Sequence, residues 1–146
     1  MKALSFGEIL WDVYPGKECL GGAPMNFSAH LSSLGCESYI LSAVGNDLRG
    51  KDAIERIQAL NVKTDYISVN EYSTGVCNVT YNSNEPIYDL SHFGAYDYIE
   101  CEDIEKLNKL DFDVFYFGTL AQRSEHKETN YLKYIKTTVD TDNFLT

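Results

Sequence analysis

Gly21-Gly22-Ala23-Pro24-Met25-Asn26 joins a glycine turn to the start of a helix, and this stretch organises the sequence around it. Two adjacent glycines let the backbone bend freely and approach a ligand closely. Pro24 suits the first position of a helix, whose first-turn amides then point toward the preceding loop. Asn26 falls in that turn, and its amide both donates and accepts hydrogen bonds, which suits a polyol. A tight turn before a helix, with no ligand, explains the same residues.

The elements around this stretch alternate between strand and helix. Phe27, Leu31 and Leu34 recur at helical spacing, and Gly35 is a natural end for their helix. Strands are expected over residues 2–6, 39–44 and 114–117, and helices over residues 24–34, 48–60, 102–110 and 125–136. Asn46 or Asp47 can cap the second helix. The alternation predicts an α/β fold with a mainly parallel sheet and helices on its faces.

Two β-rich runs interrupt this series. Residues 74–81 and 86–90 are separated by Asn-Ser-Asn-Glu, which is a hairpin signal. A hairpin is antiparallel and does not belong to a crossover series, so we interpret it as an inserted, small antiparallel β lid. The lid segments are expected near residues 13–21 and 73–91, with residues 13–17 as a loop because they contain Pro15 and Gly16.

Composition argues against several classes of protein. The net charge is −10 and no Lys/Arg run occurs, so neither nucleic acid nor an anionic membrane is an expected partner. No stretch approaches the ~20 apolar residues of a membrane span, and the N-terminus lacks a signal-peptide pattern, so we expect a cytoplasmic protein. The 4 cysteines and 3 histidines show no ligand spacing, which predicts free thiols and no metal site.

Several motifs in order resemble those of one enzyme family. The spacing of glycines and polar residues resembles the first signature of the ribokinase-like (phosphofructokinase B-type) sugar kinases at Gly22, Asn26, Ser28, Gly35 and Gly45. Four further segments resemble fructokinase segments in the same order: GEILWD (7–12), VGNDLRG (44–50), STG (73–75) and FGTLAQRS (117–124). GGAPMN in place of GGKGAN favours fructokinase-like over ribokinase-like members. The resemblance, over residues 3–134, implies a ribokinase-like fold and ATP-dependent phosphorylation of fructose or a related hexose.

The resemblance also implies contacts with a sugar. Asp12, expected at the end of the first strand, matches the carboxylate that accepts sugar hydroxyls, and Asn26 matches a second hydroxyl contact. Gly21 and Gly22 match the hinge between the lid and the main domain. Tyr96 follows the lid and either forms a wall against the sugar ring or packs in the core.

Two further residues and the lid complete the implied site. Gln122 and Arg123 follow a buried strand, where family members place substrate contacts. Arg123 either steadies the transferred phosphoryl group or covers the end of the sheet. The lid of the family closes on the sugar and often pairs with a second subunit, which makes a homodimer an expectation here. Open strand edges of this kind invite pairing.

The elements that carry catalysis in the family are not recognisable in this sequence. Family members are longer, and their second half holds a Gly-Ala-Gly-Asp element whose aspartate deprotonates the sugar hydroxyl, beside the site for ATP and Mg²⁺. Residues 94–97, Gly-Ala-Tyr-Asp, imitate that element but follow a hairpin. The sequence therefore predicts the N-terminal, sugar-binding part of a truncated kinase over residues 1–146, with no catalytic residue. A sugar-binding or dimerising fragment without catalysis is the alternative, and a nucleoside kinase is a weaker one.

Overall fold

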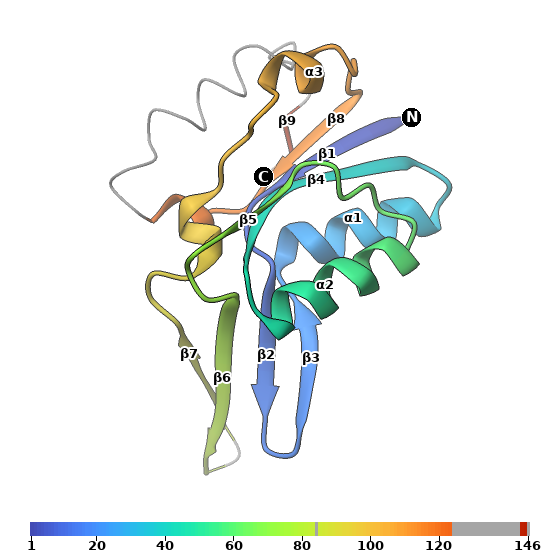
Figure 1. Ribbon diagram of the computed structural model, residues 1–146. Helices are drawn as coiled ribbons and strands as arrows, with labels where there is room; N and C mark the ends of the chain where they lie inside the picture. Colours follow the sequence, from blue (N-terminus) through green and yellow to red (C-terminus); the bar gives the residue numbers. More distant parts are fainter. Residues whose placement is uncertain (84, 124–143, 146) are drawn as a thin grey trace.

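The larger of two β-sheets is entirely parallel and forms the centre of the molecule, as the alternating elements predicted. This computed structural model describes residues 1–83, 85–123 and 144–145 (Figure 1). The strand order is β5-β4-β1-β8-β9, with bounds β1 Lys2–Phe6, β4 Glu37–Gly45, β5 Ile67–Asn70, β8 Val114–Phe117 and β9 Phe144–Leu145. The central strands β1 and β4 are almost continuously buried, which is typical of parallel strands covered on both faces.

Helices cover the two faces of this sheet. On one face lie α1 (Ala23–Ser33) and α2 (Leu48–Ala59), side by side in Figure 1, where Met25 and Ile57 pack on Ile40 and Val44. The opposite face is covered by three short elements, η1 (Ala95–Tyr98), α3 (Ile104–Asn108) and η2 (Leu120–Gln122). No helix among the described residues is long and apolar enough to cross a membrane. The helix expected over residues 125–136 lies outside the described residues.

The ends of the first two long helices follow the expected signals. Asp47 caps α2, because its Oδ1 accepts a hydrogen bond of 2.8 Å from the Gly50 amide. Gly35 follows α1 with φ of 84°, a left-handed conformation that glycine adopts without strain. Asn61 takes the same role after α2 with φ of 57°.

The residues that α1 buries are not the apolar residues that recur at helical spacing. Leu34 is 78% exposed, and the helix instead buries Pro24, Met25 and Ser28. Ser28 donates a hydrogen bond of 2.8 Å to the Ser5 hydroxyl of β1, which brings helix and strand together at small residues. Phe27 lies at the side of the helix, where its ring stacks on Tyr116 at 4.3 Å. The helical spacing thus predicted the helix correctly, and the helix approaches the sheet where Ser28 meets Ser5.

The lid is a second sheet of four strands, in which the predicted hairpin is joined by a second one over residues 10–21. Its order is β3-β2-β6-β7, with bounds β2 Leu10–Tyr14, β3 Lys17–Gly21, β6 Gly75–Asn82 and β7 Glu85–Leu90. The β6–β7 pair is antiparallel, as expected, and residues 13–17 are mostly strand, with only Pro15 and Gly16 in the turn. The β2–β3 and β6–β7 hairpins join through a parallel β2–β6 pairing and project together from the main sheet (Figure 1).

Candidate functional site

The order of the parallel sheet reverses between β1 and β8. From β1 the chain first builds β4 and β5 on one side and later adds β8 and β9 on the other. Open α/β sheets bind ligands in the crevice beyond the carboxyl ends of the strands at such a reversal. Here β1 ends next to Gly7 and Glu8, and β8 ends next to Gly118. The start of α1 and the base of the lid adjoin the same edge of the sheet.

The sequence predicted that Asp12 ends the first strand, and this prediction is wrong. The strand β1 stops at Phe6, Gly7 turns the chain with φ of 143°, and Asp12 lies within lid strand β2. It stands in register between Cys19 of β3 and Cys77 of β6. Burial raises the pKa of the Asp12 carboxyl, and a hydrogen bond from the Cys77 thiol partly offsets this effect. The half-buried Asp12 carboxyl thus lies on one face of the lid sheet, near the end where the lid joins the main sheet.

The two glycines of the hinge serve different purposes. Gly21 ends β3, and a Cβ atom there would lie 2.5 Å from Oδ2 of Asp12, so the glycine makes room for that carboxyl. Gly22 precedes α1 with φ of 111°, and a Cβ atom there would collide with the carbonyl oxygen of Glu8. Asn26 is exposed in the first turn of α1, and its backbone N–H donates a hydrogen bond of 2.9 Å to the Gly22 carbonyl oxygen. The hinge therefore joins the Asp12 strand pair to the helix that carries Asn26.

Arg123 and Tyr96 form a cluster beneath the lid. The guanidinium of Arg123 pairs with both carboxylate oxygens of Asp97, at 3.1 and 3.0 Å, and donates to the Tyr96 hydroxyl at 3.0 Å. Tyr96 is fully buried in the core, with its ring edge against Gly75. Of the alternatives for these residues, core packing for Tyr96 and cover of the sheet end for Arg123 agree with this geometry.

Gln122 lies at the end of η2, beside the same edge of the sheet. Its side-chain amide donates a hydrogen bond of 2.7 Å to the carbonyl oxygen of Gly118, the residue after β8. In this arrangement the side chain steadies the loop that follows β8. The convergence of Asp12, Asn26, Gln122 and Arg123 on one ligand stays a prediction.

Glu8 is a polar residue of this edge that the sequence reasoning missed. It is only 5% exposed, its Oε1 accepts a hydrogen bond of 3.0 Å from the Ala23 amide, and burial raises its pKa. The available signal was an acidic residue directly after an apolar strand and a glycine. That signal is weak, because an isolated acidic residue is usually exposed.

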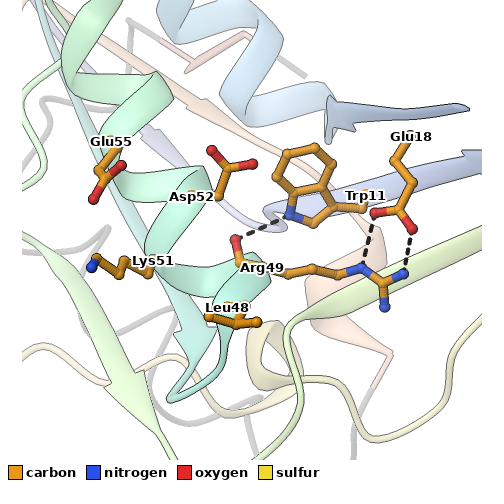
Figure 2. Close-up of a pocket in the computed structure, with 7 residues that line it drawn as sticks. All are labelled: Trp11, Glu18, Leu48, Arg49, Lys51, Asp52 and Glu55. Atoms are coloured by element: carbon orange, nitrogen blue, oxygen red, sulfur yellow. Dashed lines mark hydrogen bonds and ion pairs between the residues drawn. The ribbon is translucent and has the colours of Figure 1, made fainter.

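An open pocket lies apart from the predicted sugar contacts, between the β2–β3 hairpin and α2 (Figure 2). It encloses about 390 Å³ and is lined by Trp11, Glu18, Leu48, Arg49, Lys51, Asp52 and Glu55. Figure 2 shows how it is bridged: the Trp11 indole donates to the Arg49 carbonyl at 3.2 Å, and Arg49 pairs with Glu18 at 2.6 Å. These contacts fasten the hairpin to α2, so we interpret the pocket as a packing gap beside the lid.

Among residues 1–83, 85–123 and 144–145, no three His, Cys, Asp or Glu side chains are grouped to hold a metal ion. The same part of the chain contains no glycine-rich loop of the kinds that cradle phosphates before a helix. We therefore assign none of these residues to ATP or Mg²⁺.

Comparisons with known proteins agree on one family. The family model "pfkB family carbohydrate kinase" matches residues 13–142. An uncharacterised sugar kinase of Pyrococcus horikoshii is 31% identical over 117 residues, which are 80% of this chain and 38% of that protein. An ATP-dependent 6-phosphofructokinase of Thermoanaerobacterium thermosaccharolyticum is 34% identical over 70 residues, which are 48% of this chain and 22% of that protein.

Solved structures agree with the fold. The structure of the P. horikoshii sugar kinase superposes with a TM-score of 0.82 and 26% identity, over 93% of this chain and 49% of that one. A fructokinase of Halothermothrix orenii, at 22% identity, shares the fold with a TM-score of 0.80 over 94% of this chain and 53% of that one. The chain spans about half the length of these solved proteins, and less of the curated relatives. The fold is ribokinase-like, and this chain belongs to the pfkB family of carbohydrate kinases.

Proposed function

We propose that this chain is the sugar-binding part of an ATP-dependent kinase that acts on fructose or a related hexose. The observation that carries the proposal is the arrangement at the lid base. The Asp12 carboxyl lies over Gly21, and Gly22 leads directly into the helix turn that carries Asn26. Family membership supports the kinase activity of the whole protein, and the P. horikoshii relative has a structure in complex with ATP.

The chemistry of these side chains suits a polyol. A carboxylate accepts hydrogen bonds from sugar hydroxyls, and such charge-assisted bonds are shorter and stronger than neutral ones. The Asn26 amide can donate to one hydroxyl and accept from another. A lid that closes over the sugar excludes water and strengthens these bonds. The proton transfer and the binding of ATP are not assigned to any described residue, so we expect residues 1–146 alone to bind sugar without phosphorylating it.

The lid also supports the proposal of a homodimer, with or without catalysis. The β6–β7 hairpin exposes large apolar side chains at its tip, with Tyr81 58%, Ile87 49% and Tyr88 61% exposed. Its outer strand β7 has a free edge in the described structure, and such an edge can pair with another strand. Sedimentation equilibrium tests this: a monomeric mass over the working concentration range would exclude the dimer.

Calorimetric titration with fructose tests the sugar site. Removing the Asp12 carboxyl leaves a bound hydroxyl without its charged acceptor, at a cost of about 1.5–3 kcal/mol. We therefore expect Asp12→Ala to weaken fructose binding about ten- to a hundredfold, and Asn26→Ala to weaken it less because its bonds are neutral. Asp65→Ala, at an exposed position before β5, is the matched control and should bind as the parent does. Equal affinity in Asp12→Ala and Asp65→Ala would remove Asp12 from the site.

A further inference from the structure

The Glu8 carboxyl is buried at the reversal of the sheet, between the end of β1 and the start of α1. Its Oε1 accepts a hydrogen bond of 3.0 Å from the Ala23 amide, while its Oε2 has no hydrogen-bond partner in the described part of the structure. Only 5% of the residue is exposed. A buried polar atom without a partner costs stability, so the stabilising contact of this carboxyl is the one through Oε1.

Two glycines at the ends of β1 and β8 lie against the Glu8 carboxyl or the Pro24 ring, where bulkier residues would not fit. A Cβ atom on Gly118, after β8, would lie 2.9 Å from Glu8 Oε2 and 3.0 Å from the Pro24 ring. A Cβ atom on Gly7, after β1, would lie 2.6 Å from the same ring. The ends of both strands are therefore shaped to seat the first turn of α1 together with Glu8.

The hydrogen bond to Ala23 replaces a cap that α1 lacks. The residue before the helix is Gly22, which has no side chain, and α1 has no side-chain cap of its own. Glu8 supplies a carboxylate oxygen to the first amide of the helix, as a capping side chain does. A negative charge there is also favoured by the helix dipole. Glu8 thus ties the beginning of α1 to the end of β1 across the hinge.

We propose that Glu8 is a positioning residue of the sugar site, which fixes the first turn of α1, and with it Asn26 and the Gly22 hinge, against the ends of β1 and β8. The part of this proposal that concerns sugar rests on the proposed function above. The part that concerns the helix does not, because the Ala23 amide reports it directly. Glu8 does not touch the sugar in this proposal. Its loss weakens sugar binding because Asn26 and the Gly22 hinge are then less firmly positioned.

Hydrogen exchange of the Ala23 amide and fructose affinity, measured together by NMR, test the proposal. In Glu8→Ala we expect Ala23 to exchange at least tenfold faster and fructose to bind about tenfold more weakly, as loss of one hydrogen bond to a charged group implies. Glu8→Gln keeps a side-chain carbonyl that accepts from Ala23, so both values should stay near those of the parent. Glu105→Ala, an exposed glutamate of α3, is the matched control and should change neither.

The outcomes separate the two proposals. Unchanged exchange of Ala23 in Glu8→Ala, with circular dichroism showing a folded protein, would overturn the positioning role. An equal loss of affinity in Glu8→Gln and Glu8→Ala would also overturn it, because the charge rather than the Ala23 bond would then matter. If the parent binds no fructose, the proposed function fails while the exchange result still decides the role of Glu8. If Glu8→Ala does not fold, Glu8→Asp carries the test, since its shorter side chain cannot reach Ala23.

Discussion

Gly22 sits where the lid strand β3 passes into α1, and two properties of the backbone require glycine there. Its φ of 111° lies in a region that side chains rarely adopt, and a Cβ atom would collide with the Glu8 carbonyl oxygen. Gly35 shares only the first property, because its φ is 84° and nothing lies within 4 Å of an added Cβ. A substitution at Gly35 therefore measures backbone strain alone, whereas a substitution at Gly22 measures strain and a steric collision together.

Alanine at each position should reveal that difference. We expect Gly35→Ala to lower the free energy of unfolding by about 1–2 kcal/mol, the cost of a left-handed conformation. Gly22→Ala should lower it by clearly more, because the collision adds to a strain of similar size. Urea unfolding of both variants measures this. Equal losses would show that the hinge has room for a side chain and that the close approach of Glu8 is unimportant.

At the level of single residues, the sequence predicted local backbone features better than the place of each side chain in the fold. Local capping rules narrowed the start of α2 to Asn46 or Asp47, and Asp47 is the cap. Asp12 was assigned to the wrong strand because the turn at Gly7 separates β1 from β2 within three residues, Gly7 to Ile9. Glu8 escaped notice because burial of a carboxyl depends on a helix and a strand that are distant in sequence.

The short helix η1 holds the base of the lid to the main sheet. Its Asp97 side chain, 4% exposed, pairs with Arg123 after η2, 25% exposed, and also accepts from the Gly94 amide at 3.1 Å. Residues 94–97, which imitate a catalytic element in their letters, therefore form an anchor of a single short turn. The buried ion pair spans 26 residues of sequence and joins the loop after the lid to the loop after β8.

Removing Asp97 should destabilise the protein far more than removing a surface partner. Asp97→Ala leaves the Arg123 charge partly buried and unpaired, which typically costs about 3–5 kcal/mol. Asp52→Ala breaks the exposed pair with Arg56 on α2 and should cost far less, because solvent screens exposed ion pairs. Thermal unfolding of the two variants gives the comparison. A loss of less than about 1 kcal/mol in Asp97→Ala would show that the anchor contributes little to the lid.

At the level of elements, the parallel sheet was predictable and the lid only in part. Strand and helix alternate with clear caps and stops, so local signals sufficed for β1, α1, β4 and α2. The β6–β7 hairpin also carries a local turn signal. The parallel β2–β6 pairing has no local signal, because it joins residues 65 positions apart, such as Leu10 and Gly75. The end of β2 was also assigned to a loop over residues 13–17.

For the whole molecule, the fold and family are clear while the reaction is a proposal. The chain matches about half the length of the P. horikoshii and H. orenii proteins, and it contains the parallel sheet and the lid. The central claim is that the lid base and the first turn of α1 form one sugar site. That claim requires the Asp12 strand and the Asn26 turn to respond together to a single ligand.

A titration of the ¹⁵N-labelled chain with fructose, followed by amide chemical shifts, tests this claim most directly. The account predicts saturable shifts at Asp12, Gly21, Gly22 and Asn26 that fit one dissociation constant, and no comparable shifts at Glu55 and Lys51 in the pocket beside α2. Saturable shifts confined to that pocket, or no shifts at the hinge at fructose concentrations up to molar, would contradict it.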